Sequence, residues 1–159
     1  MYAKLKENKM KIFFLPLLFA CTLFASELKS LNLDQYLLDF DLQERTSMKI
    51  KSVEMLNMVE EGKAIVVDIR FAEEYASWHM PFTVNIPLHE LPKRLDELPK
   101  DKLIITACPH NDRANLARIY LITKGYNARY LNDGLLKVAD YLRGDNAVEF
   151  QEELKKLQK

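Results

Sequence analysis

Two short, almost wholly apolar runs mark the middle of the chain: "AIVVD" (64–68) and "LIITA" (103–107). Each has the length of a strand, and continuous apolar runs are typical of strands that are covered on both faces. Shorter runs at 47–50, 84–86 and 128–131 predict three further strands. Because helical patterns separate these runs, the sequence predicts an α/β fold with a mainly parallel sheet and helices on both faces.

Helical spacing of apolar residues fills the intervals between the predicted strands. The predicted helices are 52–60, 72–77, 92–98, 114–124, 135–142 and an amphipathic C-terminal helix within 145–159. The expected buried faces are Val53, Leu56 and Val59 in the first helix, and Leu116, Ile119, Tyr120 and Thr123 in the fourth. Residues 26–47 place Leu33, Tyr36, Leu37 and Phe40 at helical spacing, which predicts a helical lead-in.

The first 25 residues have the composition of an export signal. Four lysines precede a fourteen-residue apolar run, Ile12 to Ala25, which is shorter than the roughly 20 residues that span a bilayer. We expect residues 1–25 to be a signal peptide and the mature protein to be periplasmic or secreted from a bacterial cell. Alternatively, "LFAC" (18–21) resembles a lipoprotein cleavage box, which would leave a lipid anchor on Cys21. Membrane contact is expected only through these features.

Charge and histidine content argue against several classes of function. The formal net charge is zero, so nothing in the overall balance indicates a nucleic-acid partner. The three histidines lack metal-ligand spacing, so we expect no metal site. We also expect no organic cofactor and a monomeric protein.

Cys108 is the only cysteine beyond the signal region, and a lone thiol in an oxidising compartment is a reactive group or a liability. It lies between a predicted strand and a predicted helix, where ligands bind in parallel sheets. Backbone N–H groups, the helix dipole and Arg113 should favour the thiolate, since a free thiol has a pKa of about 8.5. A cysteine that only packs is the alternative. The intervening residues must however form a loop; they are Pro109, His110, Asn111 and Asp112.

Four segments together resemble the rhodanese-like (sulfurtransferase) family: "VVDIRFAEEY" (66–75), "WHMPFTVNIP" (78–87), "CPHNDR" (108–113) and "KGYNARYLNDG" (124–134). The first is similar to the family's Asp-x-Arg-x-x-x-Glu-Tyr segment, and the second to its His-Ile-Pro-Gly-Ala-x-Asn-Ile-Pro segment. Their order and spacing match over residues 48–144, so the resemblance implies a rhodanese-like domain with a five-stranded, mainly parallel sheet.

The resemblance also implies roles for individual residues. Cys108 would carry sulfur as a persulfide, taken from a small sulfane-sulfur donor (thiosulfate, polysulfide or persulfide) and passed to a thiol acceptor. The loop from Pro109 to Asp112 would bind the donor, and Arg113 would be its anion-binding partner. Asp68 and Arg70 would be a conformation-setting pair near the site. A solvated salt bridge from Arg70 to Glu73 or Glu74 is an equally open interpretation.

Several residues depart from the family pattern. Pro109 follows the cysteine where arginine is usual, and Asn111 stands where glycine is common. Asparagine tolerates the left-handed conformation better than most residues, so the loop can still close. His110 is either a group that hydrogen-bonds a substrate or lowers the thiol pKa, or an exposed loop residue. Efficient use of thiosulfate is therefore an open question.

Two other functions are compatible with the same pattern. A phosphatase or arsenate reductase of this fold also uses cysteine and arginine, but its loop is longer by one residue, so the six residues 108–113 favour sulfur. A non-catalytic binding or redox-sensing module would retain the fold and could retain the thiol.

Overall fold

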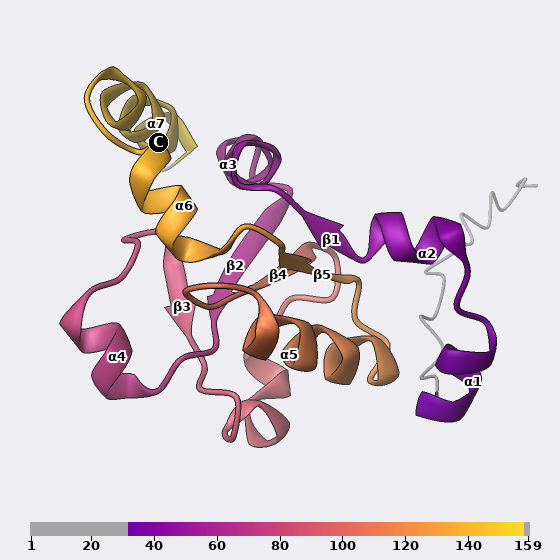
Figure 1. Ribbon diagram of the computed structural model, residues 1–159. Coiled ribbons are helices and arrows are strands. Elements are labelled where there is room, and N and C mark those ends of the chain that lie inside the picture. Colours follow the sequence, from indigo (N-terminus) through magenta and orange to yellow (C-terminus); the bar gives the residue numbers. More distant parts are fainter. Residues whose placement is uncertain (1–31, 158–159) are drawn as a thin grey trace, which may run out of the picture.

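A five-stranded sheet organises residues 32–157, which are the residues that the computed structural model describes (Figure 1). The strands are β1 (Lys49–Ile50), β2 (Ala64–Asp68), β3 (Thr83–Asn85), β4 (Leu103–Ala107) and β5 (Ala128–Leu131). Their order is β1-β5-β4-β2-β3, and every pairing is parallel. The predicted fold class is confirmed, and β2, β4 and β5 have the predicted bounds.

Seven α-helices accompany these strands within the described residues. They are α1 (Leu33–Leu38), α2 (Leu42–Ser47), α3 (Ser52–Glu60), α4 (Ala72–Ser77), α5 (Asp112–Thr123), α6 (Gly134–Tyr141) and α7 (Asp145–Leu157). None of the helices in this part of the chain is long and apolar enough to cross a membrane. The predicted signal peptide, with Cys21, lies outside the described residues.

The helix predicted for 92–98 is two short 3-10 turns instead, η1 (Leu91–Lys93) and η2 (Leu95–Glu97). Pro99 explains the early end, because a residue before proline is pushed from the helical to the extended conformation. Leu98 is extended, with φ −94° and ψ 128°.

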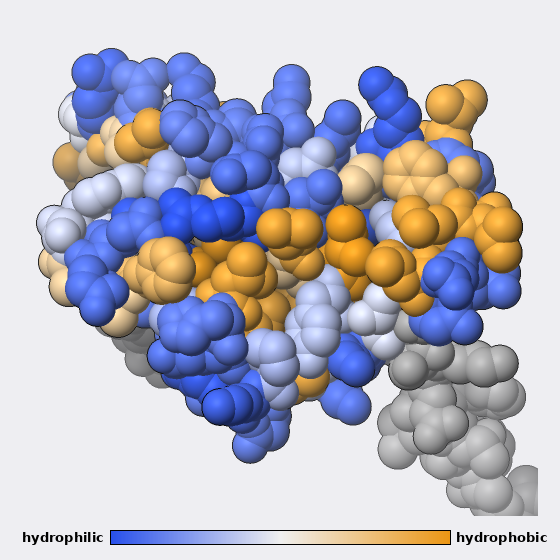
Figure 2. All heavy atoms as spheres, turned by 60° about the horizontal axis from the view of Figure 1, so that its bottom comes forward, coloured by the Kyte–Doolittle hydropathy of each residue, from blue (hydrophilic) through white to orange (hydrophobic). Residues whose placement is uncertain are grey.

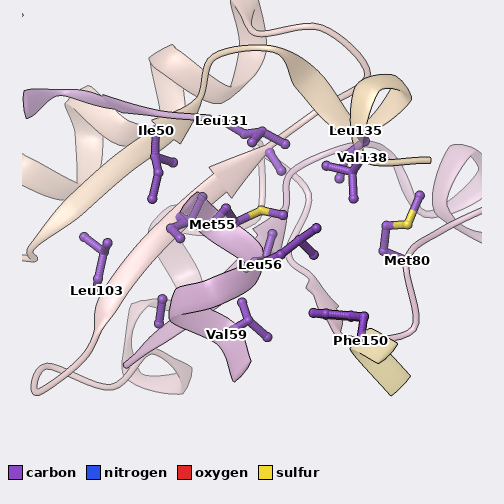
Figure 3. Close-up of a cluster of buried hydrophobic side chains, with 14 residues drawn as sticks. Ile50, Met55, Leu56, Val59, Met80, Leu103, Leu131, Leu135, Val138 and Phe150 are labelled. Carbon is purple, nitrogen blue, oxygen red and sulfur yellow. The ribbon is translucent and has the colours of Figure 1, made fainter. Parts of the chain in front are cut away.

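Two hydrophobic layers lie on opposite faces of the sheet, as expected when both faces of a parallel sheet are buried. One layer joins the sheet to α3, α6 and α7 (Figure 3), through Ile50, Met55, Leu56, Val66, Ile105, Leu135, Val138 and Phe150. The other joins it to α5 and the η turns, through Val67, Ile69, Leu91, Leu98, Ile104, Ala114, Ala117 and Leu121. Adjacent residues such as Val66 and Val67 belong to different layers because side chains alternate along a strand.

The buried faces of two helices differ from those predicted. Helix α5 buries Ala114, Ala117, Arg118 and Leu121, and leaves Leu116 59% exposed. Helix α3 buries Met55, Leu56 and Val59 but leaves Val53 47% exposed. In α5, small alanines allow the helix to lie close to the sheet, so its largest apolar side chains do not mark its buried face.

The lead-in helices attach through one buried polar cluster. Arg118 is 2% exposed, and its guanidinium donates to the Tyr36 hydroxyl, the Glu44 carboxylate and the Ala128 carbonyl. Of the apolar residues expected to pack here, only Tyr36 is buried. Figure 2 shows the resulting apolar surface at the α1–α2 end of the molecule, formed by Leu33, Leu37, Leu38, Phe40 and Leu42.

Candidate active site

Cys108 directly follows β4, at the carboxyl edge of the sheet. The strand's last residue, Ala107, pairs in register with Asp68 at the end of β2. Residues 108–111 then form a short connection to α5, which begins at Asp112. Two central strands therefore bring Cys108 and the Asp68 region to the same edge, where parallel sheets bind their ligands.

The start of α6 holds the cysteine loop in place. The Leu135 amide donates to the Cys108 carbonyl at 2.9 Å, and the Leu136 amide donates to the Pro109 carbonyl at 3.4 Å. Gly134 has φ +73°, and a Cβ there would lie 2.2 Å from the Pro109 carbonyl oxygen and 2.4 Å from that of His110. Only glycine fits this close backbone contact. The carbonyl groups of Cys108 and Pro109 thus face α6. The amide groups of the cysteine loop are not used in this contact.

Asn111 does not adopt the left-handed conformation considered for it. Its φ is −155° and its ψ is −14°. The side-chain amide donates to the Asn132 carbonyl at 2.9 Å, so Asn111 ties the loop to the turn before α6. The residue with a positive φ is Gly134, which packs against the cysteine loop. No residue of the loop itself has a positive φ.

The thiol is buried, and its pKa is shifted in the direction opposite to the one predicted. Cys108 is 0% exposed, and burial raises the pKa of its thiol above the ordinary value because the charged form loses its hydration. The backbone amides of Ala114, His110 and Arg113 act to lower this pKa, while the Asp112 carboxylate raises it. The backbone amides thus act on the pKa in the predicted direction, but burial outweighs them.

Asp112 provides the charge in contact with the sulfur. Its Oδ1 accepts from Cys108 Sγ at 3.7 Å, a distance within the range for sulfur donors. Asp112 is itself exposed and is the first residue of α5. Hydrogen bonding from the Arg113 backbone amide holds the pKa of Asp112 below its usual value, so the carboxylate is anionic at neutral pH.

Arg113 is paired with a carboxylate from another element. Its Nη1 and Nη2 donate to Glu74 Oε2 and Oε1 at 2.7 and 2.9 Å. These bonds raise the pKa of Arg113 and lower that of Glu74 to about 2. The Glu74 carboxylate therefore occupies the same two N–H groups that would bind an anionic ligand. Arg113 is a paired cation in this structure.

Asp68 and Arg70 form a buried pair, not a solvated one. Arg70 is 0% exposed, and it donates from Nε and Nη2 to the Asp68 carboxylate at 2.6–3.0 Å. Its Nη2 also donates to the Trp78 carbonyl at 2.8 Å, and its guanidinium lies 4.1 Å from the Trp78 ring centre. Trp78 directly follows α4, so the pair holds the end of the helix that carries Glu74.

The histidines are not grouped around the sulfur. His110 is an exposed residue of the loop. His79 stacks on Tyr75 with ring centres 4.1 Å apart and hydrogen-bonds its carbonyl at 3.0 Å. Within residues 32–157, no group of three or more histidine, cysteine, aspartate or glutamate side chains is arranged to hold a metal ion.

Comparison with known proteins identifies the family. Residues 52–140 match the model of the rhodanese-like domain family. The chain belongs to this family. The match includes β2 to β5, the cysteine loop and most of α6, so the rhodanese-like domain contains every site residue described above.

Similar curated proteins include enzymes and a regulator. The chain is 37% identical over 68 residues to a sulfurtransferase of Allochromatium vinosum, covering 43% of this chain and 63% of that protein. It is 28% identical over 89 residues to the thiosulfate sulfurtransferase GlpE of Pseudomonas savastanoi, covering 56% and 84%. It is 35% identical over 94 residues to the HTH-type transcriptional regulator Rv0324 of Mycobacterium tuberculosis, covering 55% and 40%. The chain thus spans less than two thirds of the sulfurtransferase and of the regulator.

Solved structures agree with the fold. The reduced CoADR-RHD of Bacillus anthracis has a TM-score of 0.57 and 29% identity, covering 62% of this chain and 18% of that one. A rhodanese-like domain protein of Staphylococcus aureus has a TM-score of 0.53 and 26% identity, covering 57% and 89%.

Sequence reasoning missed two residues of the site. The sequence indicates Glu74 only as a partner of Arg70, although it is the glutamate of the Asp-x-Arg-x-x-x-Glu-Tyr segment. The sequence presents Gly134 only as the last residue of the segment "KGYNARYLNDG", although it is the glycine that the cysteine loop packs against. Both contacts join segments that are more than 20 residues apart, so helical or strand spacing carries no signal for them.

Proposed function

We propose that this protein is a rhodanese-type sulfurtransferase in which Cys108 carries sulfur as a persulfide. The observation that supports this most directly is the position of Cys108. It follows the central strand β4 and begins the segment Cys108–Arg113, where the backbone amides of Ala114, His110 and Arg113 act to lower its pKa, in a chain of the rhodanese-like family. The sulfurtransferases among its relatives favour the same chemistry.

Two displacement steps complete the reaction without an oxidant or a metal. The thiol first releases its proton to water. Sγ then bonds to the outer sulfur of the donor, and the bond between that sulfur and the rest of the donor breaks, its electron pair leaving with the remainder. In the second step a thiolate acceptor bonds to the outer sulfur of the persulfide, and the electron pair of the broken bond returns to Sγ.

The amides of His110, Arg113 and Ala114 have a clear part in this cycle. They lower the pKa of the Cys108 thiol against the effect of burial, and they would stabilise negative charge on either sulfur of the persulfide. The Asp68–Arg70 pair is a positioning element, because Arg70 holds the end of α4 through the Trp78 carbonyl and neither residue hydrogen-bonds the sulfur.

Mass spectrometry of the purified protein tests this function. Incubation with a polysulfide should add about 32 Da, one sulfur atom, to Cys108, and cyanide or a thiol should remove it. Cys108→Ser should fold and gain no mass. Cysteine-dependent turnover of an aryl phosphate, without any gain of sulfur, would assign the loop to the phosphatase class instead. If neither occurs, a binding or sensing module is the correct interpretation.

We also propose export to the periplasm or beyond, supported by the basic and apolar pattern of residues 1–25. Mass analysis of the processed protein should give a chain that begins at Ser26. A lipid-modified Cys21 at the N-terminus would establish the anchored alternative, and an intact segment in the cytoplasmic fraction would refute both.

A further inference from the structure

The charges around Cys108 indicate which sulfur donors the site can accept. A rhodanese-like chain that resembles thiosulfate sulfurtransferases would by simple analogy use thiosulfate, a dianion. Such a donor needs positive charge near the sulfur, because two negative charges must approach a group that reacts as an anion. The balance of charge at the loop is therefore decisive.

The cation of the loop is already neutralised. Arg113 forms two hydrogen bonds with Glu74, at 2.7 and 2.9 Å, and their side chains are 30% and 36% exposed. A donor that used Arg113 would have to displace this carboxylate. A dianionic donor would then break the two charge-assisted hydrogen bonds between Arg113 and Glu74 in order to form similar bonds of its own with Arg113.

Asp112 adds a negative charge at the point of reaction. Its Oδ1 lies 3.7 Å from Sγ. A donor sulfur in contact with Sγ, about 3.5 Å away, is then at most about 7 Å from this oxygen. That is inside the Debye length of about 10 Å at 0.1 M salt, so the repulsion is only partly screened.

We propose that Asp112, together with the Glu74–Arg113 ion pair, makes the site reject dianionic donors such as thiosulfate and select sulfane donors with one negative charge or none. This rests on the proposed sulfurtransferase function. Glu74, Asp112 and Arg113 sum to one negative charge beside the sulfur, with the backbone amides as the remaining attraction for an anion. Asp112 is thus a specificity residue that acts by repulsion.

Two donors that differ in charge but hardly in size isolate this effect. Methanethiosulfonate is thiosulfate with one oxygen replaced by methyl, so it carries one negative charge instead of two. With thiosulfate, Sγ takes the outer sulfur and sulfite leaves; with methanethiosulfonate, methanesulfinate leaves. Both reactions leave the same persulfide on Cys108. Any change in the thiol pKa affects both equally and cancels in the ratio of their kcat/KM values.

The experiment measures this ratio, thiosulfate over methanethiosulfonate, in the full chain and its variants. The wild-type protein should prefer methanethiosulfonate, and Asp112→Asn should raise the ratio about tenfold, the scale of one unit charge removed at this distance. Glu74→Gln should raise the ratio too, because the positive charge of Arg113 is then no longer balanced by a carboxylate. Asp101→Asn is the matched control: Asp101 is exposed and precedes β4 at the other end of the strand, so it should leave the ratio unchanged.

Salt provides a second readout. Raising the ionic strength should increase the wild-type rate with thiosulfate more than the rate with methanethiosulfonate, and this difference should shrink in Asp112→Asn. Sulfur loading from both donors with a ratio that neither variant changes would overturn the charge selection and leave the sulfurtransferase function intact. No loading from either donor or from polysulfide would overturn both.

Discussion

Gly134→Ala should distort the cysteine loop from outside it. The new Cβ would lie 2.2 Å from the Pro109 carbonyl oxygen and 2.7 Å from the His110 Cα. Relief to an ordinary contact requires a shift of about 1 Å. The three nearest atoms all belong to the backbone, so no side-chain rotation can move them away. The loop that carries Cys108 must move.

The expected cost has two parts. An alanine at positive φ costs about 1–2 kcal/mol, and overpacking adds about 1–3 kcal/mol. Gly62→Ala separates these parts, because Gly62 has a similar φ, +66°, with nothing within 4 Å of its added Cβ. We therefore expect a loss of about 2–5 kcal/mol in the free energy of unfolding for Gly134→Ala and about 1–2 kcal/mol for Gly62→Ala.

Urea unfolding gives the stabilities, and the rate of sulfur loading on Cys108 gives the activity. A displacement of about 1 Å in a reacting group can reduce a rate about 100-fold, so Gly134→Ala should lose activity on this scale while Gly62→Ala retains it. Equal stability losses for the two variants, with near-normal loading by Gly134→Ala, would show that the loop does not depend on this contact.

Two further predictions concern ion pairs. Arg113 lowers the pKa of Glu74 to about 2, so the stability from their bridge is present above about pH 4.5 and is lost as the pH falls toward 2. Glu74→Gln should therefore make the free energy of unfolding in urea less dependent on acid pH. An unchanged pH dependence would contradict this. Arg118→Met should cost about 2–3 kcal/mol, because it leaves Glu44 without its charged partner, and should expose the lead-in to protease. Arg129→Met, which breaks an exposed bridge, should cost less than about 1 kcal/mol; equal losses would refute the difference.

The strands could be predicted because their signal is local. In β2 and β4 nearly every side chain is buried on one face or the other, so the apolar run alone locates the strand. The buried face of α5 could not be predicted this way. Arg118 is buried there because Tyr36 and Glu44 reach it from the lead-in helices, and no residue within α5 indicates that partner.

The same distinction applies at the site. The position of Cys108 followed from a strand meeting a helix, which is visible in the sequence. The direction of its pKa shift did not, because burial depends on what packs over the loop and burial is the largest influence. The state of Arg113 depends on Glu74, which lies 39 residues away on α4.

Loop length and loop charge therefore carry different information. The backbone amides of His110, Arg113 and Ala114 act to lower the pKa of the thiol, and any chain with the same backbone conformation would provide them. The charges come from Asp112, a side chain, and from Glu74, a residue of another element. Neither carboxylate is required for the backbone conformation of the loop. A substitution at either position can therefore change the charge near the sulfur, and with it the preferred donor, while the fold stays the same.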